Sequence, residues 1–168
     1  MYSMKPSVVL SLVFLAALFS QAGGTRTKGD NLYSLALFAS VTEMEKSWGH
    51  IDDSDRGRIR TDYRHMVVEK DSEITDDLLS QSGDYNVEYL DDQALIARFK
   101  KLRKEFSVLK IRSVHNEGSR LKILISVYYF KVEKGGLVFE VSDWSDVEFQ
   151  YDCEKQNYII SAVKLGGI

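Results

Sequence analysis

Apolar residues recur at helical spacing in two segments of the chain. In Asn31–Trp48 they fall three or four residues apart, with the charged residues off that stripe. Asp30 before this segment is a typical N-cap residue, and Gly49 after it is a typical stop. The segment Asp92–Phe106 repeats the pattern behind a second capping residue, Asp91. The sequence therefore predicts two amphipathic helices.

The last third of the chain has the pattern of strands. Four runs are rich in branched and aromatic residues: Ser107–His115, Arg120–Val132, Leu137–Tyr151 and Gln156–Leu165. The connections are short, so consecutive strands must be antiparallel neighbours. Upstream, Thr61–Glu69 and Tyr85–Leu90 predict a short strand pair, and the stretch between them is ambiguous. The expected fold class is α+β, a curved antiparallel sheet covered by two to three helices.

The first residues resemble an export signal. Lys5 is followed by an apolar run, Val8–Phe19, and then by the small residues Ser20 and Ala22. The run is shorter than the roughly 20 residues of a spanning helix, although an uncleaved anchor is the alternative. We therefore expect a signal peptide (1–22), a short flexible segment (23–29) and one domain (30–168). The mature protein would be secreted or periplasmic, without stable membrane insertion.

Composition excludes several classes of function. The net charge is −3 with both signs interspersed, which argues against nucleic acid and anionic membranes as partners. The single cysteine, Cys153, cannot form an internal disulfide. A calcium loop beginning at Asp52 is rejected because Arg56 and Tyr63 occupy ligand positions. No zinc spacing or phosphate-binding loop is present, so neither a metal nor a cofactor is expected.

The order of elements resembles the nuclear transport factor 2-like superfamily, which includes ketosteroid isomerases and SnoaL-type cyclases. The likeness covers Asp30–Leu165 and includes an ending, from Trp144–Phe149 to Tyr158–Ser161, similar to the family's final hairpin. It implies a cone-shaped pocket within the curved sheet and frequent dimerisation. A cystatin-type sheet is the rival, but it leaves the first helix and the short strands without a place.

Short turns should fix the register of the strands and so the faces of the sheet. They predict that Asp143 lies between Tyr128 and Lys164 on neighbouring strands, and that Leu109 lies beside Ser126. One face would then have a polar centre with apolar ends, as small-ligand pockets do. We predict that it binds ligand through Ser126, Phe130, Val141, Ser145, Lys164 and, from the short strand, Tyr63.

The opposite face would carry a compact apolar patch of Ile123, Ile125, Val127 and Trp144. Exposed patches of this kind usually mark interfaces. We therefore expect a homodimer through the outer face of the sheet. The alternative is that a helix or the C-terminal tail covers the patch.

Three residues are candidates for catalysis. Asp143 on a partly apolar face is placed to act as a general base, and Tyr128 beside it to donate to an oxyanion. His65 would be an alternative acid or base if it points into the pocket. The simpler interpretations are an Asp143–Lys164 ion pair and an exposed histidine.

Two functions stay open at this point. We expect a non-catalytic domain that binds a small apolar or amphipathic molecule or a partner protein. The alternative is a cofactor-free isomerase, cyclase or hydratase that uses Asp143 or His65 with Tyr128.

Overall fold

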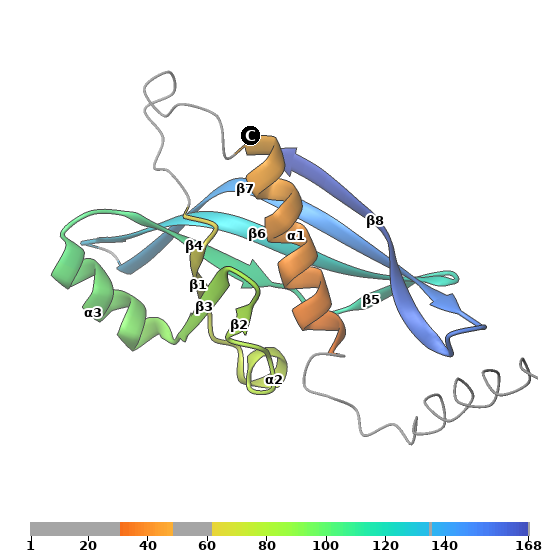
Figure 1. Ribbon diagram of the computed structural model, residues 1–168. Helices are drawn as coiled ribbons and strands as arrows, with labels where there is room; N and C mark the ends of the chain where they lie inside the picture. Colours follow the sequence, from red (N-terminus) through yellow and green to blue (C-terminus); the bar gives the residue numbers. More distant parts are fainter. Residues whose placement is uncertain (1–30, 49–61, 135, 168) are drawn as a thin grey trace, which may run out of the picture.

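The computed structural model describes residues 31–48, 62–134 and 136–167 (Figure 1). In these ranges the chain forms the helices α1 (Leu32–Trp48), α2 (Ser72–Thr75) and α3 (Asp92–Leu102). The strands are β1 (His65–Glu69), β2 (Gln81–Ser82), β3 (Tyr85–Leu90), β4 (Phe106–Ile111), β5 (His115–Glu117), β6 (Arg120–Glu133), β7 (Gly136–Asp152) and β8 (Asn157–Gly167).

The expected signal peptide, the segment 23–29, the cap Asp30 and the rejected calcium loop at Asp52 lie outside the described residues. Within the described residues, Asn31 precedes α1, and its Oδ1 accepts a hydrogen bond from the backbone N–H of Tyr33 at 2.9 Å. None of the helices within the described ranges is both long and apolar enough to cross a membrane.

All the strands belong to one sheet with the order β2-β3-β1-β4-β6-β7-β8, and β5 pairs with β6. Strand β1 is parallel to β3 and β4, whereas the other pairs are antiparallel. The long strands β6, β7 and β8 form a twisted meander, and α1 lies across it (Figure 1). The predicted α+β fold with a curved, mainly antiparallel sheet is thus confirmed.

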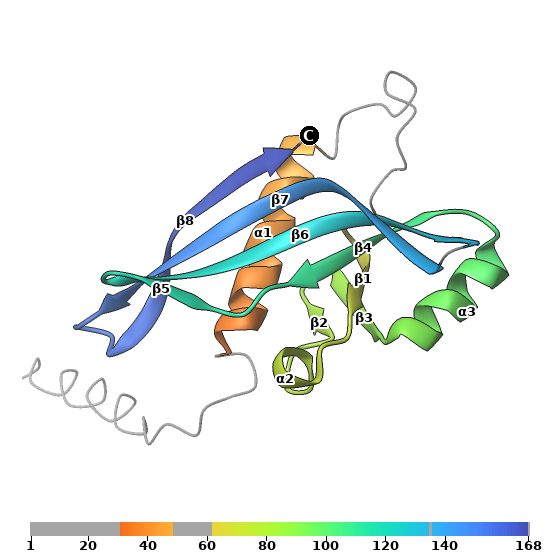
Figure 2. The same ribbon diagram turned by 180° about the vertical axis from the view of Figure 1, so that it is seen from behind.

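The two longer helices pack on opposite faces of the sheet. Along β1, Met66 and Val68 belong to the core under α1, whereas Val67 belongs to the core under α3. We call these two surfaces the α1 face and the α3 face. In Figure 2, β6 and β7 pass in front of α1 and α3 lies at one end of the sheet. Among the described elements, no helix covers the other end of the α3 face.

Helix α3 begins as predicted and ends earlier than predicted. Oδ1 of Asp91 accepts a hydrogen bond from the N–H of Ala94 at 2.8 Å, which caps its first turn. Arg103 adopts a left-handed conformation with φ 53° and ends the helix. Phe106, predicted as the last helical residue, therefore starts β4.

A β-bulge in β7 changes the predicted pairing with β6. Near the hairpin end, Tyr128 pairs with Val141 and not with Asp143. The register then shifts so that Val127 lies opposite Asp143, which leaves Ser142 as the extra residue of a bulge. Because side chains alternate along a strand, this one residue moves the rest of β7 to the opposite face relative to β6.

A second irregularity separates β4 from β5. The sequence predicts one strand from Ser107 to His115 that places Leu109 beside Ser126. Residues 112–114 instead leave the strand, and Leu109 pairs with Val127. A break of this kind shifts the register without leaving a mark in the hydrophobic pattern.

A third irregularity lies in β8. Asp143 is opposite Gly167 and not opposite Lys164, which pairs with Asp146. The register shifts within this hairpin because Ser161 is an additional residue of β8. The predicted row of Tyr128, Asp143 and Lys164 across three strands is therefore wrong.

The predicted dimer patch is not an exposed surface. Ile123, Ile125 and Val127 have no exposed area and form part of the core beneath α1. Trp144 lies on the α3 face, where its indole fills the space above Gly166; a Cβ there would lie 2.2 Å from the indole Cζ2. The alternative, that a helix covers the patch, is correct for the three aliphatic residues.

Candidate functional site

Tyr128 is on the α3 face, away from the acid predicted to lie beside it. Its ring meets that of Phe139 edge-on, with 6.0 Å between the centroids. Arg112 Nη2 donates a hydrogen bond to Tyr128 Oη at 3.4 Å, and Lys110 Nζ lies 5.4 Å from the ring centroid. Asp143 is not among these neighbours of the Tyr128 ring.

Asp143 is half-buried. It lies on the α1 face, because it pairs directly with Val127, which is fully buried beneath α1. The alternative interpretation, an ion pair with Lys164, is also wrong. Lys164 lies on the α3 face and its Nζ donates to Glu148 Oε1 at 2.5 Å. The proposed base and the proposed oxyanion donor therefore stand on opposite sides of the sheet.

His65 and Tyr63 do not share a pocket either. The His65 side chain is 71% exposed, and its Nδ1 lies 3.1 Å from Asp62 Oδ2. It borders a separate hollow of about 200 Å³ at the start of β1 and β4. Tyr63 is buried in the core beneath α1. The simpler interpretation of His65, an exposed histidine, is confirmed.

The remaining predicted binding residues are divided between the two faces. Ser126 and Phe130 are buried on the α3 face, and Val141 is 39% exposed on the same strand pair. Ser145 is buried on the α1 face, where its Oγ lies 2.5 Å from Ser40 Oγ. Tyr128, Phe130 and Val141 therefore lie close together on the α3 face. They form part of the sheet surface there, in which Phe130 is buried and Val141 is exposed.

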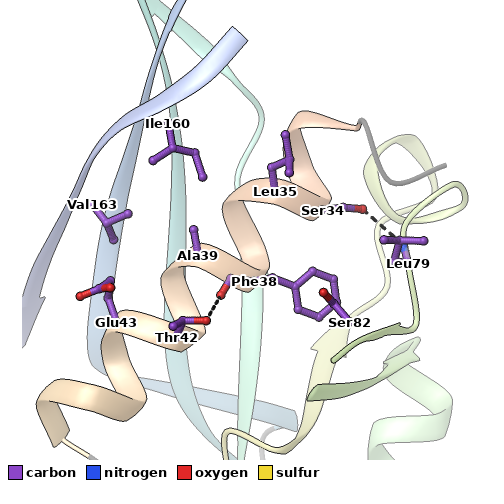
Figure 3. A pocket seen from close by; sticks show the side chains of 10 residues that line it. All are labelled: Ser34, Leu35, Phe38, Ala39, Thr42, Glu43, Leu79, Ser82, Ile160 and Val163. Atoms are coloured by element: carbon purple, nitrogen blue, oxygen red, sulfur yellow. Dashed lines mark hydrogen bonds between the residues drawn. The ribbon is translucent and has the colours of Figure 1, made fainter. Parts of the chain in front are cut away.

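A groove of about 480 Å³ lies elsewhere, along the half-buried side of α1, at the margin of the core beneath that helix (Figure 3). Its floor is formed by α1. Ile160 and Val163 of β8 form one wall, and Leu79 and Ser82 form the other. The predicted pocket site between the sheet and the helices is filled by the core under α1.

Helix α1 forms this groove because it has two apolar stripes. Ala36, Leu37, Val41 and Met44 are fully buried against the sheet. A second stripe, with the spacing i, i+3, i+4 and i+7, consists of Leu35, Phe38, Ala39 and Thr42 and is only half-buried. A helix that is apolar on most of its circumference is normally buried. The width of this apolar surface is visible in the sequence, but the prediction of a single apolar stripe did not use it.

The polar groups of the groove are mostly satisfied within the protein. Ser34 Oγ accepts a hydrogen bond from the N–H of Leu79 at 3.3 Å, and Thr42 Oγ1 donates to the carbonyl of Phe38 at 2.7 Å (Figure 3). Glu43 is the one titratable residue among the described lining residues, and it forms an ion pair with Lys46 at 2.7 Å. Apolar contact is therefore the main interaction that the groove offers.

Comparison with known proteins gives no match: no family model, no curated protein and no solved structure is significantly similar to this chain. Within the described ranges, no group of three or more His, Cys, Asp or Glu side chains is placed to hold a metal ion. The groove and the sheet are therefore the features from which a function can be inferred.

A buried carboxylate on the α3 face is the other feature that the sequence did not reveal. The Glu148 side chain is 2% exposed, and it accepts hydrogen bonds from Lys164 Nζ at 2.5 Å and Arg120 Nη1 at 3.0 Å. Lys122 Nζ lies 3.6 Å from Glu148 Oε1 and 2.7 Å from Glu117 Oε2. The hydrogen bond and charge of Lys164, together with the charge of Lys122 and the hydrogen bond from Arg120, hold the pKa of Glu148 below its ordinary value of 4.5. This ion cluster joins β6, β7 and β8.

Proposed function

We propose that this protein is an exported, non-catalytic binding domain that holds a small apolar or amphipathic molecule in the groove on α1. The observation that carries the proposal is the groove itself, about 480 Å³ with walls of leucine, phenylalanine, isoleucine and valine. Small-molecule sites usually have about 300–1,000 Å³, mainly apolar walls and a few polar groups. An amphipathic ligand would place its polar end near Ser82 or Glu43 at the rim.

The arrangement of the polar residues supports binding over catalysis. Asp143 and Tyr128 lie on different faces, and His65 is exposed at a third place. A general base must come within hydrogen-bond reach of the proton that it removes, with the oxyanion donor near the same substrate. The separation of these three groups therefore supports binding over the isomerase alternative.

Export and family membership remain part of this proposal and rest on the sequence. The apolar run Val8–Phe19 with small residues at the expected cleavage site supports secretion or passage to the periplasm. The order of helices and strands supports a nuclear transport factor 2-like fold, in which domains with and without catalysis occur. The groove differs from the pocket expected for such a cone because it lies along the half-buried side of α1, at the margin of the core.

Filling the groove tests the proposal. Ala39 lies on its floor, so Ala39→Phe would place a ring where a ligand should sit. The matched control is Ala97→Phe, on the exposed side of α3. The measurement is binding of 1-anilinonaphthalene-8-sulfonate, a probe of apolar surface, by fluorescence titration of the folded proteins.

We expect Ala39→Phe to raise the Kd of the probe by about tenfold or more, a loss of about 1.4 kcal/mol, and Ala97→Phe to leave it unchanged. Equal affinity in all three proteins, or no binding to the unmodified chain, would contradict the proposal. Circular dichroism and the urea midpoint confirm that both variants are folded.

A further inference from the structure

The two edges of the sheet differ greatly in length. Strand β2 forms one edge with two residues, whereas β8 forms the other with eleven. Within the described residues β8 pairs only with β7, so one side of its backbone has no strand partner. A long edge strand is a template for pairing with another strand unless charges, proline or short length protect it. Strand β8 contains no proline and one charged residue, Lys164.

Apolar side chains are exposed on both faces of this edge. Ile159 and Ile160 are consecutive residues with 38% and 37% exposure. Ile160 pairs with Phe149 of the α1 face, so Ile159, opposite Gln150, points to the α3 face. A partner that docks on one face of the sheet would cover one of them. A strand added at the edge would cover both.

We propose that β8 pairs in antiparallel fashion with β8 of a second copy of this chain, forming a continuous sheet across a two-fold axis. The bulge at Ser161 makes this pairing self-complementary when the axis passes between Ser161 and Ala162. Ile160 then lies opposite the partner's Val163 on the α1 face, and Ile159 lies opposite the partner's Lys164 on the α3 face. Each pair joins residues that face the same side, as an antiparallel ladder requires.

The charges of β8 agree with this register. Lys164 meets an isoleucine and not the partner's Lys164, so no like charges are opposed. The pairing also brings the groove walls of the two copies, Ile160 and Val163, next to each other across the axis. An interface of one eleven-residue strand per copy is small compared with the roughly 1,200–2,000 Å² of stable complexes. The dimer should therefore dissociate on dilution, and it should form without any ligand in the groove.

Charge reversal at one position tests the register. Ile159→Lys would place a lysine opposite the partner's Lys164 twice in the dimer, whereas Ile159→Glu would place a carboxylate there. The matched controls are Val114→Lys and Val114→Glu, because Val114 has the same 38% exposure and lies outside β8. Sedimentation equilibrium over a wide range of concentrations measures the dimer Kd of each protein.

We expect a concentration-dependent dimer for the unmodified chain, a Kd about tenfold weaker or more for Ile159→Lys, and a tighter dimer for Ile159→Glu. Both Val114 variants should leave the Kd unchanged. The net charge is −3, so general repulsion alone would give the opposite order of the two Ile159 variants. A monomer at all concentrations, or a dimer equally stable in both Ile159 variants, would overturn the proposal.

Discussion

The two faces of this sheet solve the same problem of burial in different ways. Beneath α1, Ile123, Ile125 and Val127 of β6 are fully buried among apolar side chains, and the polar contact there is a pair of serines, Ser40 and Ser145. On the other face Glu148 is buried just as deeply, under the side chains of charged residues. A helix is therefore not needed to bury a residue of the meander, because long cationic side chains also cover the surface.

The two environments shift acid groups in opposite directions. Tyr89 packs against the core beneath α1, and burial raises its pKa to about 12. Glu148 on the α3 face has a lowered pKa because Lys164, Lys122 and Arg120 stabilise its charge. Desolvation dominates on the α1 face and ion pairing on the α3 face. At Tyr89 burial beneath α1 disfavours the charged form, whereas at Glu148 the neighbouring cations of the α3 face stabilise it.

The largest expected effect comes from breaking the apolar face. Ile125→Ala removes a fully buried side chain beneath α1, and we expect a loss of about 2–5 kcal/mol in the free energy of unfolding. Leu124→Ala is the matched control, because Leu124 is the preceding residue and is half-buried on the α3 face. Urea denaturation measures both variants. Equal losses in the two would show that the faces are not as different as the structure indicates.

The elements of this fold can be predicted from the sequence more readily than their register. Helix α1 and the strands of the meander fall close to their predicted ranges because periodicity and turn residues mark them. The face to which each residue points could not be predicted, because β6 is apolar on both sides and its pattern does not show which side is buried under a helix. The extra residues Ser142 and Ser161 each shift the pairing by one, and neither serine differs from an ordinary strand residue in the sequence.

The candidate site was missed for a related reason. Counting apolar residues at helical spacing recognises α1 but does not divide its residues into two stripes. The separation of Ala39 from Leu37 depends on how the helix is rotated on the sheet. That rotation is fixed by contacts such as Ser40 with Ser145, which are 105 residues apart. Contacts between distant segments of this kind leave no local pattern.

A smaller effect should follow from removing the charge on the α3 face. Glu148→Gln keeps the shape of the side chain but weakens its interactions with Lys164 and Arg120, so we expect a lower Tm at neutral pH. The folded pKa of Glu148 lies below its ordinary value of 4.5. Its stabilisation is therefore present above that value and is lost as the pH falls through the lowered folded pKa. The variant should show a flatter decrease of Tm with acid.

Thermal unfolding from pH 7 down to pH 2 measures this difference. Glu154→Gln is the control, since Glu154 is exposed in the turn between β7 and β8. It should behave as the unmodified chain does. A Glu148→Gln profile parallel to that of the unmodified chain at all pH values would show that Glu148 has no part in the acid response.

The smallest expected effect concerns Tyr89 and needs spectroscopy to be seen. Its hydroxyl donates a hydrogen bond to the carbonyl of Leu79 at 2.8 Å, and its pKa of about 12 exceeds the ordinary value of 10.0. Because the raised pKa favours the protonated form in the folded state, this group stabilises the fold below pH 10. That stabilisation is lost as the pH rises from about 10 to 12.

In the absorbance at 295 nm, the titration of the unmodified chain minus that of Tyr89→Phe should give one tyrosine with a midpoint near pH 12. The same subtraction with Tyr151→Phe, at a tyrosine 46% exposed, supplies the reference for an exposed phenol. If the two difference curves coincide, the α1 face does not exclude charge at Tyr89, and the contrast between the two faces is lost at that position.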